Sequence, residues 1–489
     1  MLNLSADKGK KAIILFVFIG VSVFILLQSP LSPIGNGIPG TDSSVFIYMA
    51  QTMMEGQPLY IAAWDLKGPL VFFIDALGLL IAPGYVGIWI LEVISMVISM
   101  VYVYKTLRLG LNRSFSFIGT LSLFTLIVAA LESGNFTEEF ALPFICVGFY
   151  NVMRYFTQGK GNWFLCGLCL SAVILLKLNY AFPWLVFIPL VIVDMVLSKD
   201  RRIVKHALLF LLGMVVFMTP FGIYHVLTHS FYAMIEAAYI FNFAYAGNAS
   251  FYDILSSCVL LLARVDLAGI HALLTIGSLF VLAQLILKKD QHTKKILLIG
   301  VLLLNIIGLF CMSVSGRGYA HYFIPLLILL VYPVMLILKA LSTHIKNKPR
   351  KYISVVLVSI LAGAWMLPIP FNAGKAIRTT NELTETESHY VELIKDNTDP
   401  GDTIQVIGMH ASFYLLSDRK ASSRFMCFPP QDLVNTEFYQ NVIIPEVKDK
   451  LSKSIPRLVI VTREELLPFF SAELDARYHE AEKNVFIAK

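Results

Sequence analysis

Apolar stretches long enough to cross a lipid bilayer recur along most of this chain. A helix needs about 20 apolar residues to span the roughly 30 Å of hydrocarbon in a bilayer. The 489 residues are 57% hydrophobic and only 15% charged, whereas soluble proteins carry about 25% charged residues. We therefore predict a mainly α-helical, polytopic transmembrane bundle of about 11 spans. The predicted spans are residues 12–28, 85–104, 115–131, 140–153, 163–178, 181–197, 207–227, 267–287, 296–315, 322–340 and 352–370.

The apolar run 70–82 is an exception to this pattern. Pro69 and Pro83 bound it, and Asp75 interrupts it. At 1.5 Å per residue, a helix of this length extends only about 20 Å. We predict a helix that lies at the outer surface or dips into it, and not a span.

The positions of the basic residues predict the orientation in the membrane. Cytoplasmic loops carry an excess of Lys and Arg. With a cytoplasmic N-terminus and no crossing at 70–82, 21 of the 25 Lys and Arg before residue 371 fall in cytoplasmic loops. We predict a multi-pass plasma-membrane protein whose C-terminal part is extracytoplasmic. The basic residues form short clusters between apolar stretches, a pattern that does not favour nucleic-acid binding.

Four basic residues remain on the predicted outer side, near the outer ends of spans: Lys67, Lys177, Arg264 and Arg317. Desolvated cations near a membrane are costly unless they are paired. An anionic ligand at the outer leaflet would pair with them. Alternatively, each cation would pair with a neighbouring carboxylate, Lys67 with Asp65 and Arg264 with Asp266, or reach lipid head groups.

The first outer loop, residues 29–84, is rich in charge and aromatic residues. It carries Asp42, Glu55, Asp65 and Lys67. So many charges cannot lie in hydrocarbon, which places this loop at a membrane surface or in a polar cavity. We interpret Asp42 as a candidate catalytic base.

Two further polar segments follow predicted spans. LESGNFTEEF contains Glu132, Glu138 and Glu139, which suit a divalent cation or a sugar hydroxyl. Alternatively, the last two glutamates cap a helix that begins near Thr137, with Thr137 as the N-cap residue. SGRGYAHYFIP places Arg317, Tyr319 and His321 at the mouth of a span, a combination suited to a phosphate, although a lone His there is more often structural.

The composition becomes polar after Pro370, which predicts two parts: a membrane module over 1–370 and a small extracytoplasmic α/β domain over 371–489. Residues 403–409 and 457–462 read as buried strands, and 382–396, 443–453 and 464–476 as helices. No Walker motif and no GxGxxG occur, which argues against a nucleotide-driven protein.

The order of these motifs resembles the GT-C superfamily of membrane glycosyltransferases. The bacterial members most similar to it are grouped with protein O-mannosyltransferases, aminoarabinose transferases and RgtA/B/C/D-like proteins. The resemblance covers roughly residues 10–340 and is carried by GTDSSVF, GQPLY…WDLKGPL, NFTEEF and GYAHYFIP. Where family members commonly have an Asp-Glu pair and KPP, this chain has Asp42-Ser43 and Lys67-Gly68-Pro69.

The resemblance implies transfer of a hexosyl or pentosyl group from a polyprenyl-phosphate-linked donor, with inversion, to a glycan, lipid or protein acceptor of the cell envelope. Asp42 would be the general base. The groups that would bind the donor phosphate are Lys67, Lys177, Arg264, Arg317, Tyr319 and His321. The groups that would bind the sugar or a metal are Glu132, Glu138, Glu139 and Asp65. A divalent cation is the one cofactor the resemblance suggests, and its use stays open.

Two other classes of protein compete with this interpretation. A transporter or flippase of a lipid-linked saccharide would carry charges in mid-span and repeated halves. Glu92 is the clearest mid-span charge, and no convincing repeat is found. A membrane scaffold for the C-terminal domain would leave the four outer cations and Glu132 unexplained.

Overall fold

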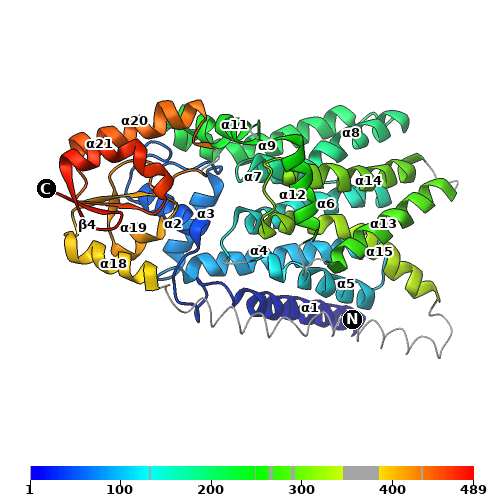
Figure 1. Ribbon diagram of the computed structural model, residues 1–489. Coiled ribbons are helices and arrows are strands. Elements are labelled where there is room, and N and C mark those ends of the chain that lie inside the picture. The colour runs from blue at the N-terminus through cyan, green and yellow to red at the C-terminus, as the bar shows by residue number, and fades with distance from the viewer. Residues whose placement is uncertain are drawn as a thin grey trace. The chain divides into compact units, whose positions relative to one another are not determined.

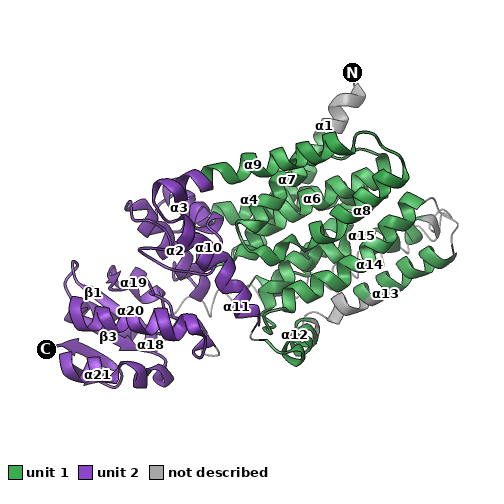
Figure 2. Ribbon diagram, turned by 90° about the horizontal axis from the view of Figure 1, so that it is seen from above, with its two compact units in different colours: residues 1–29, 89–220, 249–376 green, residues 30–88, 221–248, 377–489 purple. Residues whose placement is uncertain are grey.

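The computed structural model describes residues 2–131, 134–247, 249–263, 268–287, 292–344, 385–430 and 433–489. The chain divides into two compact units, each assembled from three segments that are distant in sequence (Figure 2). Unit 1 contains residues 1–29, 89–220 and 249–376, and unit 2 contains residues 30–88, 221–248 and 377–489.

Unit 1 is built from long apolar helices (Figure 1). They are α1 (Leu2–Leu26), α4 (Val86–Leu107), α5 (Arg113–Thr125), α6 (Thr137–Gln158), α7 (Trp163–Ile174), α8 (Phe182–Leu197), α9 (Ile203–Leu227), α12 (Phe251–Ala263), α13 (Ala268–Leu287), α14 (His292–Ser313) and α15 (Leu327–His344). Short 3₁₀ turns η1 (Val128–Ala130), η2 (Leu178–Ala181) and η5 (Ala320–Leu326) stand between them. Helix α4 begins in unit 2, and α9 ends there.

Ten of the predicted spans coincide with helices, and the eleventh, 352–370, lies outside the described residues. Among the described residues, six helical segments are long and apolar enough to cross a membrane. Other helices at predicted spans are shorter, as α7 with 12 residues illustrates. The mainly α-helical, multi-pass architecture is therefore confirmed, whereas the count of about 11 spans stays a prediction.

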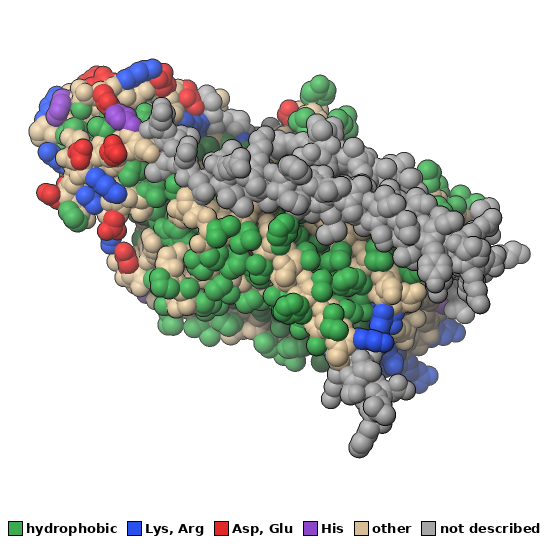
Figure 3. Space-filling model, turned by 90° about the horizontal axis from the view of Figure 1, so that it is seen from below, with side chains coloured by type: hydrophobic (Ala, Val, Ile, Leu, Met, Phe, Trp, Pro, Cys, Tyr) green, Lys and Arg blue, Asp and Glu red, His purple; other side chains and the backbone are tan. Residues whose placement is uncertain are grey.

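The outer surface of the helices is apolar. On α9, Leu208, Leu211, Val215 and Val216 are all exposed. Figure 3 shows hydrophobic side chains covering the helices on one face, while charged side chains gather over the C-terminal domain. A soluble protein rarely exposes so extended an apolar surface, so these helices face lipid.

Helices α7 and α9 pack backbone against backbone. A Cβ added to Gly167 would lie 1.9 Å from the carbonyl oxygen of Phe210, and one added to Gly213 would lie 2.0 Å from that of Phe164. Close approach through small residues is typical of helix pairs in membranes.

Unit 2 combines short helices with one sheet. The helices are α2 (Thr41–Met54), α3 (Leu70–Ile81), α10 (Phe231–Ile235), α11 (Phe241–Gly247), α18 (Glu385–Asn397), α19 (Ser412–Ser417), α20 (Ile444–Asp449) and α21 (Leu467–Arg477). The shorter helical turns are η3 (Glu236–Ile240), η7 (Tyr439–Ile443), η8 (Lys450–Ser454) and η9 (Glu464–Leu466). Helix α3 confirms the helix predicted at 70–82, and its position relative to a membrane stays a prediction.

The sheet has the order β2-β1-β3-β5-β4. Its strands are β1 (Thr403–Ile407), β2 (Lys420–Ala421), β3 (Leu458–Val461), β4 (Tyr478–Glu482) and β5 (Val485–Ala488). Strand β1 pairs in parallel with β2 and β3, whereas β5 pairs antiparallel with β3 and β4. The predicted strands β1 and β3 and the predicted helices α18, α20 and α21 are confirmed.

An aromatic cluster joins the three segments of unit 2. The ring of Trp64 lies 5.1 Å from Phe241, 5.5 Å from Phe425 and 5.4 Å from Phe438, measured between centroids. The backbone N–H of Trp64 also donates to the carbonyl of Arg424 over 2.9 Å. The first outer loop, the 221–248 segment and the C-terminal residues therefore share one core.

Candidate functional site

Asp42 is the second residue of α2 and stands in its first turn, after the N-cap residue Gly40. A carboxylate at this position interacts favourably with the helix dipole. Its Oδ2 lies 3.4 Å from Nζ of Lys67, and the side chain of Asp42 is 36% exposed, against 11% for Lys67. One turn further along α2, the buried ring of Phe46 lies 5.2 Å below the same ammonium group. Lys67 is thus held between a carboxylate and an aromatic face.

Asp65 contacts Lys67 in a way that the sequence did not suggest. Its Oδ1 accepts a hydrogen bond of 2.8 Å from the backbone N–H of Lys67, whereas the ammonium group of Lys67 pairs with Asp42. Burial raises the pKa of the Asp65 carboxyl, the positive charge of Lys67 opposes that rise, and the negative charge of Asp42 adds to it. Asp65 therefore supports the loop that presents Lys67.

A second ion pair lies in unit 1. Nζ of Lys177 is 3.5 Å from Oε1 of Glu138, and the side chain of Glu138 is only 2% exposed. Helix α6 begins at Thr137, so Thr137 is the first helical residue and not the N-cap residue. Its hydroxyl donates to Oε2 of Glu138 over 3.0 Å and lies 2.7 Å from the hydroxyl of Tyr180. The N-cap residue is Phe136, so the prediction for Thr137 is wrong, whereas the Glu139 side chain accepts from the backbone N–H of Phe136, which confirms capping by a glutamate.

Aromatic rings surround the second ion pair. Lys177 Nζ lies 4.3 Å from the centroid of Tyr322. The ring of His321 is stacked between Phe136, at 4.2 Å, and Tyr319, at 5.4 Å. Arg317 Nη1 lies 3.3 Å from the hydroxyl of Tyr319. The sequence segment around Arg317 and the first residues of α6 thus form one cluster in unit 1.

Glu139 belongs to a separate carboxyl pair. It is buried, and it accepts from the backbone N–H of Phe136 over 3.4 Å. It lies near Glu92 of α4, which accepts from the backbone N–H of Asn135. Glu92, noted in the sequence only as a mid-span charge, therefore anchors the turn before α6.

The other predicted site residues, Glu132 and Arg264, lie outside the described residues. Within the described ranges, no group of three or more His, Cys, Asp or Glu side chains is arranged to hold a metal ion.

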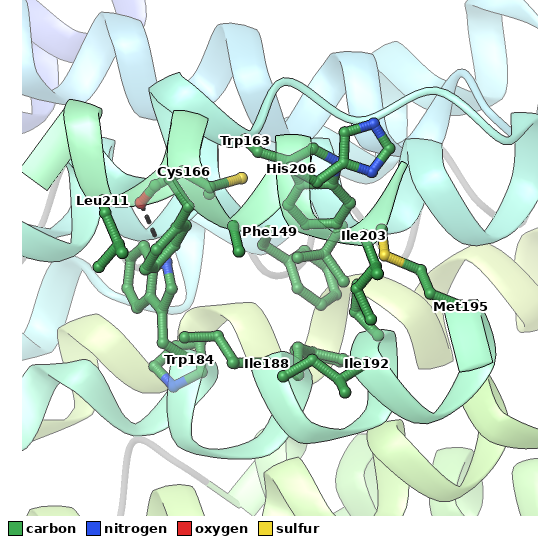
Figure 4. Close-up of a pocket in the computed structure, with 17 residues that line it drawn as sticks. Phe149, Trp163, Cys166, Trp184, Ile188, Ile192, Met195, Ile203, His206 and Leu211 are labelled. Carbon is green, nitrogen blue, oxygen red and sulfur yellow. Dashed lines mark hydrogen bonds between the residues drawn. The ribbon is translucent and has the colours of Figure 1, made fainter. Parts of the chain in front are cut away.

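An apolar cavity of about 230 Å³ opens between α6, α7, α8 and α9 (Figure 4). Phe149, Trp184, Ile188 and Leu211 line it, and the indole N–H of Trp184 is already bound to the carbonyl of Cys166 over 3.2 Å. The one ionisable ring that lines the cavity is that of His206, whose centroid lies 5.8 Å from that of Trp163. The cavity lacks the convergent polar groups that bind and activate a sugar donor, so we exclude it as the site of chemistry.

The whole chain shares its fold with membrane glycosyltransferases of known structure. ArnT from Cupriavidus metallidurans bound to undecaprenyl phosphate is 11% identical, with a TM-score of 0.60 and 98% of each chain covered. The oligosaccharyltransferase of Archaeoglobus fulgidus is 12% identical, with a TM-score of 0.57, over 95% of this chain and 69% of that one. Both have the GT-C fold, which confirms the resemblance at the level of fold.

No curated protein sequence matches the chain. A family model does, and it extends from residue 4 to residue 362, through all the described helices of unit 1. Because the match spans well over half of the 489 residues, the chain belongs to the family described as "Putative competence-induced protein Ccs4 N-terminal domain".

Proposed function

We propose that this protein is an inverting membrane glycosyltransferase that moves a hexosyl or pentosyl group from a polyprenyl-phosphate-linked donor to a cell-envelope acceptor. The observation that carries the proposal is the partly exposed Asp42 held 3.4 Å from Lys67, in a chain with the GT-C fold. ArnT has been solved with undecaprenyl phosphate, and archaeal AglB with a dolichol phosphate, which supports a donor of this class.

Asp42 takes the proton of the acceptor hydroxyl in this proposal. The acceptor oxygen forms a bond to the anomeric carbon from the face opposite the phosphate. The bond between that carbon and the phosphate oxygen breaks, and its electron pair leaves with the polyprenyl phosphate. A base needs to reach its substrate, and Asp42 is exposed enough to do so.

Cations stabilise the charge that develops on the leaving phosphate. We assign this role to Lys67, Lys177 and Arg317, with Tyr319 and His321 as further phosphate contacts. Arg264 is a proposed member of the same group. Glu132, Glu138, Glu139 and Asp65 are proposed to hold the sugar or a divalent cation, either directly or by fixing these basic groups.

We further propose the orientation that the basic residues predict, with about 11 spans, a cytoplasmic N-terminus and residues 371–489 outside. Three segments predicted to lie outside, the first loop, residues 228–248 and the C-terminal domain, contribute to the same compact unit. This grouping supports a common side for them, because segments on opposite sides of a bilayer cannot share a core.

The test uses membranes that contain the full-length protein, supplied with polyprenyl-phosphate hexoses and pentoses. We expect release of polyprenyl phosphate together with a glycosylated product, and loss of both in Asp42→Asn. Glu55→Gln is the matched control, because Glu55 is an exposed carboxylate at the other end of α2. A transporter would instead move the lipid-linked sugar without transferring it, and full transfer by Asp42→Asn would contradict the assignment of the base.

A second set of variants tests the phosphate contacts. We expect Lys67→Ala and Arg317→Ala to raise the apparent KM for the donor. Unchanged donor affinity in both variants would remove these residues from the proposed site.

A further inference from the structure

The sheet of unit 2 reverses its strand order between β1 and β3. From β1 the chain passes through α19 to β2 on one side, and then through α20 to β3 on the other side. Ligands of open α/β sheets bind beyond the carboxyl ends of the strands at such a reversal. Here those ends are followed by Gly408 after β1 and by Thr462 and Arg463 after β3.

Three polar side chains at and near this edge end in buried atoms that have no hydrogen-bond partner: Oγ1 of Thr462, Nη2 of Arg463 and the hydroxyl of Tyr439. Tyr439 is 0% exposed, and it opens the π-helical turn η7, a form of helix that is frequent at functional sites. Folded proteins pair nearly all of their buried polar groups, so an unsatisfied cluster of this kind needs an explanation.

The guanidinium group of Arg463 is fixed in place with one nitrogen left over. Its Nε lies 2.8 Å from Oε1 of Glu465, and its Nη1 donates to the carbonyl of Pro429 over 2.8 Å. The ring of Tyr439 lies 6.3 Å from that of Phe428, the neighbour of Pro429, which places Tyr439 and Arg463 in one neighbourhood. A planar guanidinium held on two sides is preorganised to bind an oxyanion through its free edge.

This sheet edge is joined to the loop of Asp42 and Lys67 by residues 424–429. The carbonyl of Arg424 accepts from Trp64, and the N–H of Phe428 donates to Gly408 over 2.8 Å. Residues 424–429 therefore link the edge of the sheet to the Asp42 loop within unit 2.

We propose that Arg463, Tyr439 and Thr462 form a binding subsite for an oxyanion, phosphate or carboxylate, carried by the acceptor. The assignment of this anion to the acceptor rests on the proposed function, whereas the anion site itself is inferred from the three unpartnered side-chain atoms. Each of the three unpartnered atoms can donate a hydrogen bond, and one of them belongs to a cationic guanidinium group. The ligand that accepts these hydrogen bonds is therefore an anion. None of the three atoms touches solvent, so binding loosens the packing around η7.

The subsite is tested by anion binding to the full-length protein in nanodiscs. Inorganic phosphate and acetate are titrated at constant ionic strength, with chloride as the reference, and binding is followed by calorimetry and by the shift in unfolding temperature. We expect the wild type to bind at least one of the two oxyanions. Arg463→Gln and Tyr439→Phe should each weaken that binding at least tenfold.

Arg457→Gln is the matched control, because Arg457 is an exposed arginine at the amino end of the same strand β3. It should bind anions as the wild type does. Tyr439→Phe keeps the buried ring, so it remains informative if Arg463→Gln does not fold. Binding of phosphate alone identifies a phosphorylated acceptor, and binding of acetate as well includes carboxylates. Absence of oxyanion binding by the wild type, or wild-type affinity in Tyr439→Phe, overturns the proposal.

The anion-binding test of the subsite and the transfer test of the proposed function can have opposite outcomes. Loss of transfer in the Asp42 test with intact anion binding would leave the subsite standing. Transfer that depends on Asp42, in a protein that does not bind either oxyanion, would remove the subsite and leave the enzyme.

Discussion

Each unit contains a lysine–carboxylate pair among those predicted site residues that the structure describes, and the two pairs have almost the same length. Lys67 and Asp42 are 3.4 Å apart, and Lys177 and Glu138 are 3.5 Å apart. Their surroundings differ, because the carboxylate of Asp42 is 36% exposed and that of Glu138 is 2% exposed. The two carboxylates therefore differ in burial and not in their distance from a lysine, and burial determines which chemical role each can have.

An exposed carboxylate can exchange a proton with an incoming hydroxyl, as a general base must. A buried carboxylate with a lysine and a threonine hydroxyl as partners is instead an anchor for the cation. Removing one member of a buried pair leaves an uncompensated charge, which is strongly destabilising. Asp42 and Glu138 should consequently respond to substitution in opposite ways, one in activity and the other in stability.

The largest expected effect on stability comes from Glu138→Ala. It should lower the free energy of unfolding by about 3–5 kcal/mol, because Lys177 loses its buried counter-charge. Asp42→Ala should lower it by less, because solvent reaches Asp42 and the carboxyl of Asp65 remains beside Lys67. Denaturant unfolding in matched detergent measures both. The apolar double variant Glu138→Leu/Lys177→Met should recover most of the loss, and equal losses in the two single variants would break the comparison.

A smaller effect is expected from the titration of Asp65. Burial raises the pKa of this carboxyl in the folded protein, so the folded state binds its proton more tightly than the unfolded state does. The stability contributed by this group is therefore present at low pH and is lost as the pH rises through the raised pKa. We expect Asp65→Asn, which carries no ionisable group, to flatten the pH dependence of unfolding in this acidic-to-neutral window. An unchanged slope would show that Asp65 ionises as freely folded as unfolded.

The smallest effect is expected at the shortest ion pair of the three. Lys420 of β2 lies 2.6 Å from Glu55 at the end of α2, but the two side chains are 68% and 49% exposed. Glu55→Gln should change the free energy of unfolding by less than about 1 kcal/mol, and added salt should abolish the difference. A loss as large as that of Glu138→Ala would mean that the distance between the charges, and not their burial, determines how much stability such a pair contributes.

The sequence predicts the parts of this fold that depend on local pattern. The length of an apolar run is a local property, so the helices appear where the runs are. The strands β2, β4 and β5 were not predicted. Strand β2 has only two residues and β5 only four, and β4 reads YHEAE, with neither alternation nor a hydrophobic run. Their pairing comes from the neighbouring strands and not from their own residues.

Side-chain partnerships in the candidate site depend on tertiary structure and were only partly predictable. The proximity of Arg317, Tyr319 and His321 follows from their closeness in sequence. The ion pair of Glu138 with Lys177, and the proximity of Glu139 to Glu92, join residues that are far apart in sequence and leave no pattern in it. Tyr180 was not singled out at all, although its position three residues after Lys177 was a signal available in the sequence.

The rate of sugar transfer, measured side by side for Asp42→Asn and Glu138→Gln, tests the central claim most directly. Both variants remove one carboxylate charge and keep its shape, so they differ only in which of the two pairs they change. We predict that Asp42→Asn lowers kcat by about 100-fold or more while the donor KM stays near that of the wild type. Glu138→Gln should retain most of kcat in the fraction that folds. Transfer by Asp42→Asn at the wild-type rate would contradict the account.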